Sequence, residues 1–172
     1  DKKYVDIYMA HLNDPSYSVI DQTAIALGKS KDARVFDALM KLAPTPSWKN
    51  RVQFAALNGL AWLEDKRAFE YGYNTAQNKQ LPPLIREYAR ILLSFIGKGE
   101  PRAFEVFSQS IKVASEAGNM NTVYSGIDAL VRIADPRGQQ VFDALKVKFK
   151  DKPSAMETIT KSEVEFKAAI KP

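Results

Sequence analysis

The chain has 172 residues, of which 45% are hydrophobic and 26% are charged, a size and composition that suit one globular domain with a sizeable core. It contains no Cys and a single His, His11, which excludes disulfides, thiol catalysis and zinc sites that need Cys or several His ligands. No apolar run approaches the roughly 20 residues of a membrane span, and the basic residues behind the net charge of +5 are dispersed, so we expect neither a membrane span nor a nucleic-acid partner.

The two ends of the chain are predicted to form lone helices. The stretch "KKYVDIYMAHL" has an amphipathic pattern over about 2–13, and a second terminal helix is expected over about 154–170. His11, which lies far from any Ser or Cys motif, is expected to be an ordinary packing residue. The chain begins with Asp1 rather than Met, so we expect it to be a fragment of a longer polypeptide.

Between these helices one short phrase recurs four times. It reads "SKDARVF", "LEDKRAF", "GKGEPRAF" and "IADPRGQ" in chain order. Its acidic residues are 33, 35 and 35 positions apart, and an Arg follows two positions after each of them. The four pairs are Asp32 with Arg34, Asp65 with Arg67, Glu100 with Arg102, and Asp135 with Arg137. A fixed period of this length is typical of a repeat protein.

Each phrase has the chemistry of a helix start. An Asp at the N-cap accepts a hydrogen bond from an otherwise unpaired backbone N–H, and Pro, present as Pro101 and Pro136, suits the first helical position. Glu100 is a weaker cap than the three Asp residues. Each repeat is therefore a first helix, a short turn and a second helix. The repeats are predicted at about 15–47, 48–82, 83–119 and 120–152, with first helices at 15–29, 48–63, 83–97 and 120–133 and second helices at 32–43, 66–78, 101–117 and 136–150.

Apolar residues keep a constant register to the acid of each repeat. Five positions before it the chain has Leu27, Leu60, Phe95 and Leu130, and eight before it Ala24, Leu57, Leu92 and Ile127. Six before it the residues are small, which predicts a close approach of a neighbouring helix: Ala26, Gly59, Ser94 and Ala129. Four after it come Phe36, Phe69 and Phe104, and then Gln139 breaks the column, so Val141 and Phe142 are expected to fill that core.

These patterns predict an all-α fold. A two-helix unit of this size cannot bury its apolar face alone, whereas stacked units share a continuous core. We therefore expect a single domain over 1–172, an α-α superhelix (a HEAT/armadillo-like solenoid) of about four helix pairs whose open ends the terminal helices cover.

The Arg of each phrase needs a separate explanation, because a cation in the first turn of a helix opposes the helix macrodipole. We expect a structural ladder in which each Arg bonds the acid, or an inter-helix carbonyl, of an adjacent repeat, since guanidinium supplies five donors. The alternative is a functional basic stripe along one edge of the domain.

Three aromatic residues are candidates for an interface. Trp62 stands three positions before its acid, where the other repeats have Lys29, Gly97 and Arg132, and Trp is enriched at binding hot spots. The alternative is a ring that lies flat over its own repeat. Tyr71 and Tyr73 follow in the second helix of the same repeat, where one is expected in the core and the other on the inner surface.

The stretches "QTAIALGKSKDARVFDAL" and "AALNGLAWLEDKRAFEYG" resemble HEAT-like repeats, including the short subtype of the phycobilisome lyase proteins. Together with "PPLIREYARILL", they are similar to the C-terminal HEAT-like domain of bacterial M1-family zinc aminopeptidases over about 15–150. In that family a preceding domain carries the H-E-x-x-H zinc motif and a G-x-M-E-N-like motif. Neither motif occurs in this chain, so the resemblance carries over no catalytic residue and no metal ligand.

The resemblance implies a non-catalytic accessory domain that packs on the peptidase domain of the same polypeptide and restricts access to its active site. This chain would then need no cofactor of its own, and zinc would belong to the preceding domain. The alternative is a free-standing HEAT-like scaffold that binds another protein or peptide. A bilin-lyase-like enzyme is a weaker option, because the matching repeat is structural in the lyase group too. A nucleic-acid binder is also a weaker option, because the basic residues are dispersed along the chain.

Overall fold

A computed structural model describes residues 2–171, so Asp1 and Pro172, the limits of the predicted domain, lie outside the described residues. The described residues form ten α-helices, four short 3₁₀ turns and no strand. The prediction of an all-α fold is therefore confirmed for this part of the chain. The chain divides into two compact units, Asp1–Ile96 and Gly97–Pro172. The division falls in the turn between the two helices of the predicted repeat 83–119.

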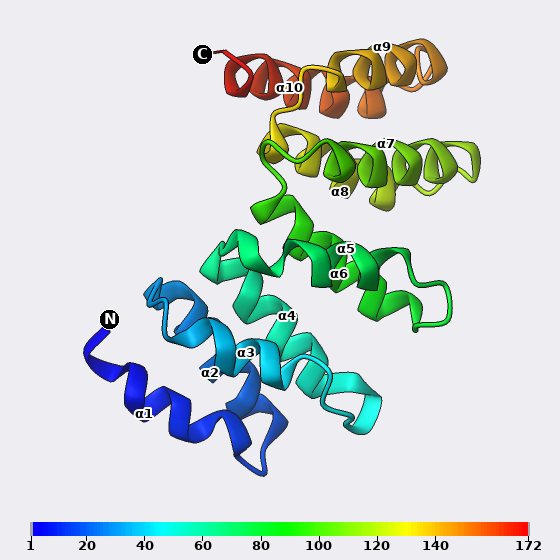
Figure 1. The fold of residues 1–172 in the computed structure, drawn as a ribbon. Helices are drawn as coiled ribbons and strands as arrows, with labels where there is room; N and C mark the ends of the chain where they lie inside the picture. The colour runs from blue at the N-terminus through cyan, green and yellow to red at the C-terminus, as the bar shows by residue number, and fades with distance from the viewer. Residues whose placement is uncertain (1, 172) are drawn as a thin grey trace. The chain divides into compact units, whose positions relative to one another are not determined.

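The first unit contains α1 to α6 (Figure 1). Their bounds are Val5–Ala10, Tyr17–Ser30, Val35–Leu42, Arg51–Leu63, Phe69–Gln77 and Pro83–Ile96. Helix α4 packs against both α2 and α6, and it buries nine of its 13 residues. A helix that is apolar on most of its circumference belongs in the centre of its unit. Helix α3 packs on α4 and helix α5 on α6, so each second helix contacts the first helix of the following repeat more extensively than its own.

The second unit contains α7 to α10, which span Pro101–Glu116, Met120–Ile133, Gly138–Lys148 and Pro153–Ala169. Figure 1 shows α7 beside α8 and α9 beside α10, and α10 also packs on α8. Phe142 of α9 and Phe166 of α10 are fully buried, with ring centroids 5.2 Å apart. The expectation that Phe142 fills the fourth core is therefore confirmed, whereas Val141 is only half-buried.

Most predicted helix ranges agree with the observed helices to within a few residues. The predicted N-terminal helix over about 2–13 is instead the short helix α1, with a 3₁₀ turn on each side of it. The second helix of each of the first two repeats begins with a turn before the regular α-helix, and the range 48–63 begins with a 3₁₀ turn, Trp48–Asn50, before α4. Lys49 and Asn50 there have positive φ angles of 49° and 58°. Sequence periodicity does not reveal such a reversal, because neither residue is a glycine.

The apolar columns lie in the core with two exceptions. The columns five and eight positions before the acid are buried at Leu27, Leu60, Leu130, Ala24, Leu57, Leu92 and Ile127. Phe95 and Phe104 are half-buried instead, so the expected core position is wrong for these two rings.

The small-residue column predicts a close helix approach, and Gly59 makes one. A Cβ on Gly59 would lie 2.7 Å from the carbonyl oxygen of Ala24, which means that the α2 and α4 backbones are in direct contact. Gly28, outside the predicted column, meets Gly59 from the other side of the same contact. Ala26, the predicted member in α2, is only half-buried. The α2–α4 crossing therefore rests on Gly28 and Gly59.

A left-handed residue precedes every acid of the repeated phrase. Lys31, Glu64, Gly99 and Ala134 have φ angles of 55°, 59°, 86° and 51°, and each stands directly before its acid. At Lys31, Glu64 and Ala134 this conformation is the C-cap that ends the first helix and redirects the chain into the second. In the third repeat α6 already ends at Ile96, and Gly99 supplies the left-handed residue directly before Glu100.

Replacing Ala134 by glycine should stabilise the second unit. A non-glycine residue in the left-handed region is strained, so we expect the free energy of unfolding to rise by about 1 kcal/mol. The reverse change, Gly99→Ala at φ 86°, should lower it by a similar amount. Urea unfolding of the two variants checks the prediction, and changes of the same sign would contradict it.

Candidate functional site

The four predicted acid–Arg pairs lie in the turns between first and second helices. Asp32, Asp65 and Asp135 each accept a hydrogen bond from the backbone N–H of the Arg two residues later, at 3.0, 2.9 and 3.0 Å. Glu100 makes no side-chain capping bond, and α7 begins instead with Pro101 at its first position. Arg102 lies half-buried in that first turn. The sequence therefore predicts three caps and the weakness of the fourth.

Three of the guanidinium groups bond the acid of their own turn. Each of Arg34, Arg67 and Arg137 forms a two-pronged ion pair with the Asp of its own turn, with Nη2–Oδ2 distances of 2.8, 2.6 and 2.8 Å. Hydrogen bonds from the Arg side chains outweigh partial burial and lower the pKa of Asp65 and of Asp135 below the usual range. In these three turns the Arg side chain is thus paired with the acid of its own turn.

The same Arg side chains also reach a neighbouring helix. Arg67 places its guanidinium carbon 3.9 Å from the centroid of the Phe36 ring on α3. Arg137 lies 4.3 Å from the Phe104 centroid on α7, and its Nη2 donates to the carbonyl oxygen of Pro101 at 3.1 Å. Arg34 pairs with Asp6 of α1 at 3.1 Å. These contacts join each turn to an element earlier in the same unit, mainly through aromatic faces that the sequence pattern did not identify.

Variants at the second turn separate capping from ion pairing. Asp65→Ala should lower the free energy of unfolding by about 1 kcal/mol because it removes the N-cap. Asp65→Asn keeps a capping oxygen and should lose clearly less. Arg67→Ala should cause a small loss, since the Arg67 side chain is 54% exposed. Urea unfolding measures all three, and a loss of partner binding without a loss of stability in Arg67→Ala would favour the functional stripe.

Trp62 lies at the end of α4 and is 38% exposed. Its ring lies 5.7 Å from the Phe95 ring, and the Lys29 ammonium is 4.5 Å from its centroid. Lys31 donates a hydrogen bond to its carbonyl oxygen. These contacts place one part of the ring against its own unit and leave another part accessible.

The two candidate tyrosines do not share those contacts. Tyr73 stacks on Phe69 with ring centroids 6.1 Å apart, and both Tyr71 and Tyr73 are half-buried on α5. Burial raises the pKa of Tyr71, against a hydrogen bond with Thr75 that lowers it. Within the first unit, Trp62 is therefore the most accessible of the three candidate interface aromatics.

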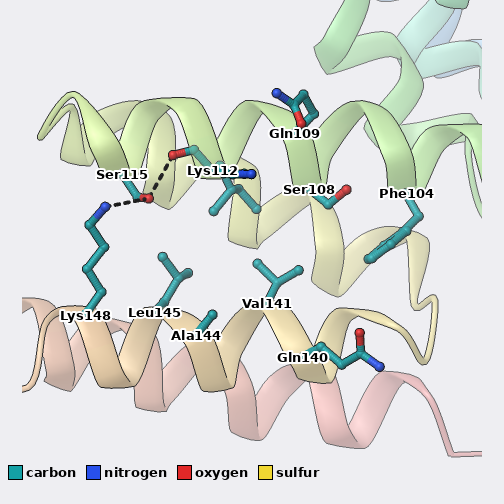
Figure 2. Close-up of a pocket in the computed structure, with 11 residues that line it drawn as sticks. Phe104, Ser108, Gln109, Lys112, Ser115, Gln140, Val141, Ala144, Leu145 and Lys148 are labelled. Carbon is teal, nitrogen blue, oxygen red and sulfur yellow. Dashed lines mark hydrogen bonds between the residues drawn. The ribbon is translucent and has the colours of Figure 1, made fainter.

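A groove between α7 and α9 in the second unit has no counterpart in the sequence prediction (Figure 2). Its volume is about 390 Å³. Ile111 and Leu145 form a buried floor, and Phe104 and Val141 form half-buried walls. We call this the α7–α9 groove. The only sequence signal near it is the break of the Phe column at Gln139, directly before the lining residues Gln140 and Val141.

The charged residues of the α7–α9 groove lie at one end. Lys112 and Lys148 are exposed and are the only charged side chains that line it. Lys148 spans the groove and lies 3.3 Å from the Ser115 hydroxyl, which in turn donates to the carbonyl oxygen of Lys112 at 2.9 Å (Figure 2). The groove therefore combines an apolar floor with a basic end.

Two further hollows have a different character. One, of about 430 Å³ between α8 and α10, is lined mainly by polar groups that include Asp128, Glu157 and Glu165. Burial, and the nearby Glu165, raise the pKa of Asp128 against the opposing effect of Arg132. The other, of about 250 Å³ in the first unit, lies between the α1 region and α3.

The structure offers no group of His, Asp and Glu side chains placed to hold a metal ion within residues 2–171. In the same range no helix is both long and apolar enough to cross a membrane. No protein-family model matches this sequence, and no curated protein matches it with significant similarity.

Proposed function

We propose that this chain is a non-catalytic helical-repeat domain that binds protein. Within its polypeptide it is the C-terminal accessory domain of an M1-family aminopeptidase, where it packs on the peptidase domain and restricts substrate access. The observation that carries the proposal is the turn motif, a left-handed residue followed by an acid and an Arg, which recurs at spacings of 33, 35 and 35. The columns on which the M1 resemblance rests are in register with this motif.

The packing inside each unit supports a superhelical arrangement. Helices α2, α4 and α6 pack in succession, and each second helix covers the following first helix, as expected where repeats share one core. The continuation of these pairs into one HEAT/armadillo-like superhelix over 1–172 is part of the proposal.

A second candidate function is that of a free-standing scaffold for another protein or peptide. The α7–α9 groove favours it, because an apolar floor bounded by polar rims is a common recognition surface for a helical segment. Both candidates make the chain a binding domain. In the first the partner is a domain of the same polypeptide, and in the second it is a separate protein or peptide.

The reading frame upstream of Asp1 separates the two candidates. An H-E-x-x-H motif with a downstream Glu would support the accessory domain, and purified full-length protein should then release N-terminal residues from peptides in a zinc-dependent manner. A start codon close to Asp1 would overturn that candidate and leave the free-standing scaffold. Trp62→Ala in the full-length protein then tests whether this exposed ring contributes to docking, with Trp48→Ala, 63% exposed, as the matched control.

A further inference from the structure

We propose that the α7–α9 groove binds an acidic, amphipathic helical segment of a partner protein. The proposal rests on the binding role proposed above, and it is independent of whether a peptidase domain precedes this chain.

The groove exists because α7 and α9 each pack mainly on another helix. Helix α7 packs on α8, and α9 packs on α10, so contacts between α7 and α9 are sparse. Figure 2 shows side chains of the two helices pointing toward one another across the open space, with Phe104 and Ser108 on one side and Val141 and Leu145 on the other. The α7–α9 groove is therefore an unfilled position between two helices.

The dimensions of the groove suit a helix. Its lining residues on α7 run from Phe104 to Ser115, and those on α9 run from Gln140 to Lys148. At 1.5 Å of rise per residue the α7 stripe is about 17 Å long, or about three helical turns. The side-chain ridge of a third helix, with apolar residues at i, i+4 and i+7, would lie between the two and cover Ile111 and Leu145.

The positive charge of Lys112 and Lys148 favours an acidic occupant of the groove. Lys146, on the same helix as Lys148, is paired with Glu163 of α10 at 2.8 Å and Asp143 of α9 at 3.4 Å. Lys148 instead contacts the neutral hydroxyl of Ser115. Across the described residues neither Lys112 nor Lys148 has a carboxylate partner. A segment that carries carboxylates at this end of the groove would supply one, and a basic segment would be repelled.

Helix energetics give Lys148 a competing role. It lies in the last turn of α9, where a cation also stabilises the helix macrodipole. A Lys148 variant therefore changes both the charge of the groove and the stability of the last turn of α9. The test therefore also needs a substitution at an exposed groove position that leaves both lysines in place, and Ala144 is such a position.

The experiment is a fluorescence titration of the purified chain with two labelled helical peptides of about 14 residues. Both carry leucines at i, i+4 and i+7, and one carries glutamates after the last leucine where the other carries lysines. The acidic peptide should bind at least about tenfold more tightly than the basic one. Ala144→Glu should weaken its binding by about tenfold or more, while Val147→Glu, at a 75% exposed position of α9 outside the groove, should not.

A pair of double variants tests the basic end. Lys112→Glu with Lys148→Glu should abolish the preference for the acidic peptide, and Lys79→Glu with Lys150→Glu, an equal charge change outside the groove, should retain most of it. Circular dichroism verifies that each variant stays helical.

Equal binding of the two peptides, no binding of the acidic one, or an equal loss in both members of a variant pair would overturn the proposal. A concentration-dependent dimer that Ala144→Glu disrupts would also overturn it, in favour of a second copy as the occupant. None of these results bears on the upstream reading frame, so failure here and failure of the accessory-domain proposal are distinguishable.

Discussion

Gly28→Ala should lower the free energy of unfolding by about 2–3 kcal/mol. A Cβ on Gly28 would overlap the carbonyl oxygen of Gly59 on α4 and would lie 2.9 Å from the Cβ of Trp62. The atoms in the way belong to backbone and to the root of a side chain, so no rotamer change relieves the overlap. Helices α2 and α4 must separate, and fully buried residues such as Leu27 and Leu57 lose contacts. The higher helix propensity of alanine, about 1 kcal/mol, offsets only part of this cost.

Gly72→Ala is the matched control. Its Cβ would meet the Leu92 and Leu93 methyl groups at 3.2 and 3.3 Å, and the ends of flexible side chains can move by a few tenths of an ångström. The propensity gain of about 1 kcal/mol should then leave this variant neutral or slightly more stable. Urea unfolding followed by circular dichroism compares the two. A Gly28→Ala protein as stable as Gly72→Ala would contradict the direct backbone contact between α2 and α4.

The helices and their turns were predictable because their causes are local. A cap and a breaker act within a few positions of one another, so Asp65 with its capping bond to Arg67 could be located from composition and spacing alone, whereas the left-handed Glu64 before it could not. The periodicity strengthened this inference, since each of the four repeats supplied an independent example of the same turn.

The partners of the Arg side chains were less predictable because they depend on packing. The sequence prediction assigned each guanidinium to the acid, or to an inter-helix carbonyl, of an adjacent repeat. Arg67 pairs instead with Asp65 of its own turn, whereas Arg137 also donates to the Pro101 carbonyl of the preceding repeat. Nothing local marks Phe36 as the ring beneath Arg67, because that contact joins residues 31 positions apart. The α7–α9 groove was missed for the same reason. It arises from where α7 and α9 do not pack, which no periodicity records.

Gln139 shows how a broken pattern can carry information. It takes the place of the Phe column in the fourth repeat, and the sequence suggested only that other residues fill that core. In the structure its side-chain nitrogen donates to Glu163 of α10 at 2.7 Å and to Asp143 at 3.0 Å. A polar side chain at position 139 thus supplies a hydrogen-bond donor to the buried Glu163 carboxylate of α10. Neither residue is identifiable as a partner of the other from sequence, since they are 24 positions apart.

Glu163 is a buried carboxylate that three side chains hold. Its side chain is 6% exposed, and its two oxygens face Lys146 at 2.8 Å, Lys167 at 2.7 Å and Gln139. Burial raises the pKa of the carboxyl group, but the hydrogen bonds from Lys146, Lys167 and Gln139 outweigh it and lower the pKa from 4.5 to about 2. The folded state therefore favours the ionised form.

The folded pKa of Glu163 lies below its unfolded value, so this carboxylate stabilises the fold at any pH above about 4.5, and the contribution is lost as the pH falls toward about 2. A shift of this size corresponds to roughly 3 kcal/mol. Solvent reaches Lys146 and Lys167, which are 30% and 54% exposed, and screening reduces the expected contribution to about 2 kcal/mol.

Glu163→Gln should therefore destabilise the second unit by about 2 kcal/mol at pH 7 and by much less at pH 2, where the wild-type carboxyl group is itself becoming protonated. Glu165→Gln, at an exposed position of the same helix, is the control and should change little. Urea unfolding from pH 2 to 7 measures the difference. A loss that is constant with pH would mean that packing rather than charge holds Glu163.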